Sequence, residues 1–126
     1  MRAFVISIII LVILSIFIGV HSYVMLNLAE NINSKCEHVK TLVKDDSWND
    51  VSNTLGEIQQ VWNSRRMWAS LTISTNEIEQ IEISLHQSMA LAELHEKSDF
   101  MSEFIMFSML IDHIPHQEGF HIEEIL

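Results

Sequence analysis

The sequence predicts an all-α protein, in which an N-terminal transmembrane helix continues into an up-down bundle of three to four helices. Three observations lead to this class. A charge-free apolar run stands near the start, apolar residues recur at spacings of three and four along the rest, and glycine and proline are scarce, with 3 Gly and 1 Pro. This spacing is typical of one helix face, whereas strands alternate. We expect a transmembrane anchor over residues 1–23 and an acidic bundle over residues 24–126.

The apolar run extends from Ala3 to Val20 and contains no charged residue. At about 1.5 Å per residue it is roughly 27 Å long, close to the thickness of the hydrocarbon core of a bilayer. It exceeds the apolar region of a signal peptide, which is about 7–15 residues, and the segment Val20-His21-Ser22 matches a small-x-small cleavage site poorly. We therefore expect residues 3–20 to lie in the bilayer as an uncleaved anchor; a cleaved signal peptide is the alternative.

The charges beside the span predict its orientation. Arg2 and the amino terminus favour a cytoplasmic N-terminus and an extracytoplasmic helical domain. Lys35, Lys40 and Lys44 argue for the reverse. They lie at or beyond the edge of the zone of about 15–20 residues that sets topology, and acidic residues stand among them. The expected location is the cell membrane, with a single span and the N-terminus inside.

The first helix is expected to run from the span to about Lys44 without a break, because its apolar spacing continues beyond Val20. The turn "KDDSWND" follows, with Ser47 or Asp46 as the cap of a second helix that ends near Leu71. The predicted inward residues of these two helices are Met25, Leu28, Ile32, Cys36, Val39, Val43, Trp48, Val51, Leu55, Ile58 and Trp62.

Ser74 and Glu77 form a capping box that begins a third helix. A fourth helix follows the break "HEKSD", and Pro115 predicts its end at His113 or Ile114. The third helix is expected to bury Ile78, Ile81, Leu85, Met89 and Ala92, with Ile83, Ala90, Leu91 and Leu94 widening the face. The fourth is expected to pack through Phe100, Phe104, Phe107, Leu110, Ile111 and Ile114, and a final apolar clip on the bundle would comprise Phe120, Ile122, Ile125 and Leu126.

The tail "DHIPHQEGFHIEEIL" is rich in histidine and carboxylate, which are ligands for zinc and iron. The candidate metal set is His113, His116, Glu118 and His121. An i, i+3 histidine pair shares a helix face only if the helix is continuous, and Pro115 stands between these two. The favoured explanation is a helix stop with His113 in the last turn, where a cation suits the helix dipole. No metal and no cofactor are therefore expected.

Three further features have two explanations each. Trp48 and Trp62 are fourteen residues apart and fit the core, whereas Trp68 departs from that register and can reach a surface. Arg65 and Arg66 either pair with a carboxylate of the next helix, such as Glu77 or Glu82, or hold an anionic ligand. The single Cys36 is either a buried apolar residue or the site of an intermolecular bridge.

The charge balance excludes some partners. The formal net charge of −10 makes nucleic acid an unsuitable partner, because phosphate binding requires clustered Lys and Arg, and it opposes binding to an anionic membrane surface. The sequence contains no nucleophile elbow, phosphate loop or CxxC pair. We expect a protein that is not an enzyme.

The order of several motifs resembles an uncharacterised bacterial family of short single-span membrane proteins, a domain of unknown function, family four-three-six-three. The motifs are the tryptophan spacing Trp48, Leu55, Trp62 and Trp68, then "NEIEQIEISL", "ALAEL", "DHIP" and "IEEIL". The segments "ISTNE" and "HQSM" depart from the family pattern. The resemblance covers nearly the whole chain. It implies a membrane-anchored helical domain and no particular activity.

Two functions follow from these observations. The first is a membrane-anchored interaction module, an accessory or scaffold that binds a membrane protein or a second copy through exposed apolar residues. Trp68, Met101 and Phe104 are the candidates for that surface. The second is a cell-surface sensor of metal or ligand that uses the histidine and glutamate residues of the tail. The sensor function predicts that the histidine and glutamate side chains of the tail converge within reach of one ion, whereas the interaction module does not require this.

Overall fold

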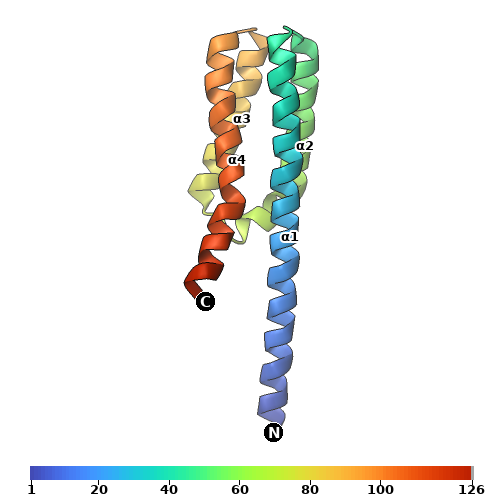
Figure 1. Ribbon diagram of the computed structural model, residues 1–126, viewed down its shortest axis with the longest axis vertical. Coiled ribbons are helices and arrows are strands. Elements are labelled where there is room, and N and C mark those ends of the chain that lie inside the picture. Colours follow the sequence, from blue (N-terminus) through green and yellow to red (C-terminus); the bar gives the residue numbers. More distant parts are fainter. Residues whose placement is uncertain (126) are drawn as a thin grey trace.

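The computed structural model describes the backbone of residues 1–125 and the side chains of residues 1–114. Its helices are α1 (Arg2–Lys44), α2 (Trp48–Ser70), α3 (Thr75–Glu93) and α4 (Lys97–Ile125). Helices that follow one another in the chain are antiparallel neighbours, and α4 returns to pack on α1 (Figure 1). The predicted all-α, up-down bundle is confirmed, with four helices. As predicted, α1 is unbroken to Lys44.

The core lies between the four helices above residue 21 of α1. From His21 onwards α1 buries one residue in every three or four, whereas residues 1–20 are all exposed and extend beyond the bundle (Figure 1). Trp62, Phe100, Phe104, Phe107 and Met25 are among the largest fully buried side chains. Burying side chains of this size contributes about 1.5–3 kcal/mol each, so the bundle has a substantial apolar core for its length.

The N-terminus of α3 has the predicted cap. The Ser74 hydroxyl accepts a hydrogen bond from the backbone N–H of Glu77 at 3.2 Å. This bond satisfies one of the backbone donors that a helix start leaves unpaired. Ser47 occupies the N-cap position of α2 as predicted, but its side chain makes no capping hydrogen bond.

The two turns at the end of the bundle far from the apolar segment have the same backbone design. Asp46 and His95 both adopt positive φ, at 55° and 56°. In each turn the following amide reaches back to the preceding helix: Ser47 N–H donates to the carbonyl of Leu42 at 3.0 Å, and Glu96 N–H to that of Leu91 at 3.1 Å. This pattern is the Schellman motif, which ends a helix by satisfying its last carbonyls.

Side chains also connect these two turns. The His95 ring stacks on Trp48 with centroids 5.3 Å apart, and the Lys97 ammonium lies 3.6 Å from a carboxylate oxygen of Asp46. The α1–α2 and α3–α4 turns are therefore held beside each other, which fixes the pairing of the two helical hairpins at this end.

The prediction that the fourth helix ends at His113 or Ile114 is wrong. The backbone of α4 remains helical through Pro115 to Ile125, and its last turns lean away from α1 (Figure 1). Proline lacks one amide donor and crowds the preceding turn, but a helix tolerates this when the residues on both sides keep their own hydrogen bonds. His113 therefore does not lie in a last turn. The side chains of the predicted apolar clip lie outside the described residues.

The predicted wide stripe of α3 is also corrected in part. Ile78, Ile81 and Leu85 are buried as expected, but Ile83 is 54% exposed and Leu94 is 70% exposed. Among the described residues each helix packs on two neighbouring helices, so the outer face of α3 stays in contact with solvent.

Candidate functional site

Helix α4 carries two apolar stripes with different surroundings. The inner stripe is fully or almost fully buried and consists of Phe100, Phe104, Phe107, Ile111 and Ile114. The outer stripe is exposed: Ile105 by 43%, Met106 by 53% and Met109 by 66%. Because the inner stripe already completes the core, the outer stripe has no packing partner among the described residues.

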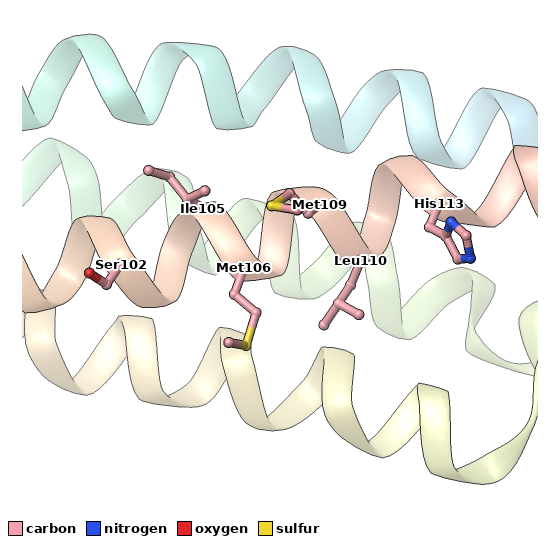
Figure 2. Close-up of a pocket in the computed structure, with 6 residues that line it drawn as sticks. All are labelled: Ser102, Ile105, Met106, Met109, Leu110 and His113. Carbon is pink, nitrogen blue, oxygen red and sulfur yellow. The ribbon is translucent and has the colours of Figure 1, made fainter.

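The outer stripe lines a shallow, open groove of about 490 Å³. Its lining residues are Ser102, Ile105, Met106, Met109, Leu110 and His113. Met106 and Leu110 extend towards α3, whereas Ile105 and Met109 lie on the opposite side of the α4 axis (Figure 2). These residues recur at spacings of three and four, the arrangement by which one helix packs against another.

The groove has acidic margins. Between Lys97 and His113, α4 carries Asp99, Glu103 and Asp112. Lys97, the one Lys or Arg of α4, is engaged with Asp46 at the far end of the bundle. Asp112 accepts a 3.5 Å hydrogen bond from the Asn33 amide of α1. The outer face of α4 is thus an apolar stripe with carboxylates on its flanks. Within the described residues, no neighbouring cation neutralises these carboxylates.

The three predicted partner-binding residues differ in burial and position, and they do not form one surface. Phe104 is fully buried, so the prediction that it is exposed is wrong: its ring stacks between Phe100 and Phe107, with centroids at 5.2 and 5.9 Å. Met101 is half-buried and packs against the core. Trp68 lies near the end of α2 and is not among the residues that line the groove.

Trp68 lies where the apolar segment meets the bundle. Its ring stacks on Phe17 of α1 with centroids 6.2 Å apart, and its carbonyl oxygen is 2.8 Å from Nε2 of His21. His21 is buried at 4% exposure and also lies against the ring of Phe17. Met67 and Leu71, the apolar neighbours of Trp68 along α2, are 80% and 57% exposed.

Arg66, the second arginine of the predicted basic pair, connects α2 to α3. Arg66 binds Glu82 of α3 through two hydrogen bonds, Nε to Oε2 at 2.9 Å and Nη2 to Oε1 at 3.2 Å. The indole N–H of Trp62 donates to the same carboxylate at 3.2 Å. The Arg66 hydrogen bond is the main cause that lowers the pKa of Glu82. The predicted pairing of this arginine with Glu82 is confirmed.

A comparison with protein families now identifies the domain. The family model described as a domain of unknown function (DUF4363) matches residues 20–125. The chain belongs to this family. Neither a curated protein nor a solved structure matches the chain. The DUF4363 match begins where the bundle begins and leaves out the apolar segment before it.

Two of the motifs that suggested this family meet in space. The tryptophan spacing places Trp62 on α2, the segment "EIEQIEISL" places Glu82 on α3, and the two side chains are joined by a hydrogen bond. The tryptophan motif and the glutamate motif therefore contribute the two sides of one contact between α2 and α3.

Of the four candidate metal ligands, one has a described side chain and three do not. His113 is exposed at one end of the groove of α4. His116, Glu118 and His121 lie outside the described side chains. Among residues 1–114, no group of three or more His, Cys, Asp or Glu side chains is placed to hold a metal ion.

Proposed function

We propose that this DUF4363 protein is a single-span, membrane-anchored module without catalytic activity, which binds a helix of a membrane-protein partner along the outer face of α4. The observation that carries the proposal is the outer stripe of Ile105, Met106 and Met109 on a bundle whose core is already filled. An exposed apolar stripe bordered by polar residues is typical of a protein interaction site. A partner helix can bind in such a groove through apolar residues at spacings of three and four.

The charges around the groove favour a partner with basic flanks. Two copies of this face would bring Glu103 and Asp112 against carboxylates of the other copy, and like charges across an interface oppose association. A partner helix with an apolar stripe and Lys or Arg at its margins would meet the same carboxylates favourably. We therefore assign the groove to a different chain and not to a second copy.

The anchor supports the choice of a membrane protein as partner. One helix of the described chain, α1, is long and apolar enough to cross a bilayer. The same helix passes without a break into the bundle, and Phe17 within its apolar part is in ring contact with Trp68. A protein retained through this segment holds α4 roughly along the membrane normal. The groove then faces sideways, towards the extramembrane part of a neighbouring membrane protein on the extracytoplasmic side.

Site-specific photocrosslinking in cells tests the proposal. A benzophenone amino acid replaces Met109 in the groove, and a second variant carries it at Ile83, an exposed apolar position of α3 with 54% exposure. We expect Met109 to give one crosslinked membrane protein, mapped by mass spectrometry to an amphipathic helix with basic flanks, and Ile83 to give none. Met109→Glu should abolish co-purification of that protein because it places a charge in the apolar stripe.

Two results contradict the proposal. Equal crosslinking of the same protein from Met109 and Ile83 would show that the groove has no special role. A crosslinked product of twice the mass of the chain would make the occupant a second copy.

A further inference from the structure

The two ends of the bundle differ in chemistry. The turns far from the anchor read "KDDS" and "HEKSD" and are rich in charge, whereas the stretch from Met67 to Asn76, which includes the α2–α3 turn, contains no charged residue. At this turn Met67 is 80% exposed and Leu71 is 57% exposed. At the far end Leu94 is also 70% exposed, but it stands beside the charged residues of "HEKSD", whereas the exposed apolar residues of the α2–α3 turn lie in a stretch without charge.

The position of this turn relative to the anchor is fixed by contacts. Trp68 stacks on Phe17, which lies within the apolar run of residues 3–20, and its carbonyl oxygen lies 2.8 Å from Nε2 of His21, the first residue after that run. Because α1 is one continuous helix, any depth of residues 3–20 in a bilayer also sets the depth of Trp68. The α2–α3 turn lies beside α1 at this level, at the lower end of the bundle (Figure 1).

We propose that the α2–α3 end of the bundle, through Met67, Trp68 and Leu71, inserts into the headgroup–acyl boundary of the bilayer that holds the anchor. Tryptophan is enriched at that depth, where its ring has an apolar body and a polar edge. Tyr23 of α1, which is 68% exposed and follows Phe17 by less than two helical turns, suits the same boundary. The inference rests on the proposed anchor and adds a second, non-spanning contact with lipid.

The insertion is apolar and not electrostatic. The chain has a formal net charge of −10, which opposes an anionic surface, and Arg66 near the turn is engaged with Glu82. The lipid contact therefore requires no anionic headgroup. The bundle is held at the membrane surface by α1 and by this turn, so that the groove of α4 keeps a fixed height and direction.

Depth-dependent fluorescence quenching on the full chain in phosphatidylcholine vesicles tests the insertion. Single cysteines replace Met67, Leu71, Met109 or Ile10 in a Cys36→Ala background, and each carries an environment-sensitive fluorophore. We expect a lipid with a spin label near the headgroup to quench the Met67 and Leu71 labels at least about twofold more strongly than the label at Met109, an exposed methionine in the middle of α4. The Ile10 label should respond best to a spin label deep in the acyl chain.

The positions separate failure of the anchor from failure of the turn. Deep quenching at Ile10 with no more quenching at Met67 and Leu71 than at Met109 would overturn the insertion and leave the anchor intact. An unquenched Ile10 label would overturn both. Quenching at Met67 that appears only when phosphatidylglycerol is added would also overturn the inference, since it would make the contact electrostatic.

Discussion

At the scale of single residues, Glu82 is the polar link between α2 and α3. Its carboxylate accepts hydrogen bonds from the buried Trp62 and from Arg66. Glu82→Gln removes the charge that strengthens these bonds, and we expect a loss of about 1 kcal/mol in the free energy of unfolding at pH 7. Chemical denaturation in mild detergent measures the loss. Glu79→Gln is the control: this exposed carboxylate of the same helix acts on Arg66 through its charge alone, so its loss should change the free energy of unfolding less.

The effect of Glu82→Gln depends on pH with a defined sign. The Arg66 hydrogen bond, against the opposing effect of burial, holds the pKa of Glu82 below its ordinary value of 4.5. A carboxyl group of this kind stabilises the folded state above its unfolded pKa, and the contribution is lost as pH falls through the folded pKa. The difference between wild type and Glu82→Gln should therefore be full at neutral pH and shrink below about pH 4.5. A difference that grows on acidification would contradict this assignment.

Cys36 is the second residue whose chemistry the structure defines. Its side chain is fully buried, and burial raises the pKa of its thiol to about 12 although the positive charge of Lys40 acts in the other direction. The thiolate is the reactive form, so the folded protein should react with a thiol reagent at pH 8 at least about a hundredfold more slowly than the protein in guanidinium. Rapid labelling of the folded chain, or a disulfide-linked dimer without reductant, would instead favour the intermolecular bridge.

At the scale of secondary-structure elements, the sequence predicts the helices better than their surfaces. The spacing of three and four and the Ser74 cap place α1, α2 and α3 within one residue or so of their observed ends. On α4 the same spacing describes two stripes, and composition alone does not say which faces inward. The prediction that Phe104 belongs to a partner surface is wrong because Phe104 shares a register of three and four with Phe100 and Phe107. This register is the signal that identifies the core stripe.

Other features of the site depend on contacts between distant segments. The stacking of Trp68 on Phe17 joins residues 51 positions apart in the sequence, and no local pattern predicts it. The outer stripe of α4 is visible in the sequence as Ile105, Met106 and Met109, but its exposure follows from the number of neighbours that α4 has. Because this bundle gives each helix two neighbours, a second apolar stripe has no place in the core.

The continuation of α4 beyond Pro115 leads to a prediction about that element. Proline supplies no amide donor for the carbonyl of Ile111 and costs about 3 kcal/mol relative to alanine within a helix. Pro115→Ala should therefore raise the protection of the backbone amides of residues 116–125 from hydrogen exchange. Met109→Ala, an exposed position on the same helix, should leave that protection unchanged. A loss of protection in Pro115→Ala would show that the proline supports the observed backbone.

At the scale of the whole molecule, one helix connects the bilayer to the interaction surface. Residues 3–20 of α1 form the proposed span, and residues from His21 onwards pack in the bundle, with no break between the two parts. The groove of α4 therefore has a defined distance from the membrane only if the helix does not bend at their junction. The contacts of Trp68 with Phe17 and His21 stiffen that point, since they tie the junction to α2.

The orientation of the molecule is the last prediction, and it rests on the charges that flank the span. Asn53, an exposed residue of α2, is replaced by cysteine in the Cys36→Ala background and treated in intact cells with a membrane-impermeant maleimide. We expect full labelling, because Arg2 and the amino terminus favour the cytoplasmic side and the bundle then lies outside. Labelling only after permeabilisation would place the bundle in the cytoplasm. Arg2→Glu should lower the labelled fraction, because Lys35, Lys40 and Lys44 then carry the stronger positive bias and draw the domain inwards.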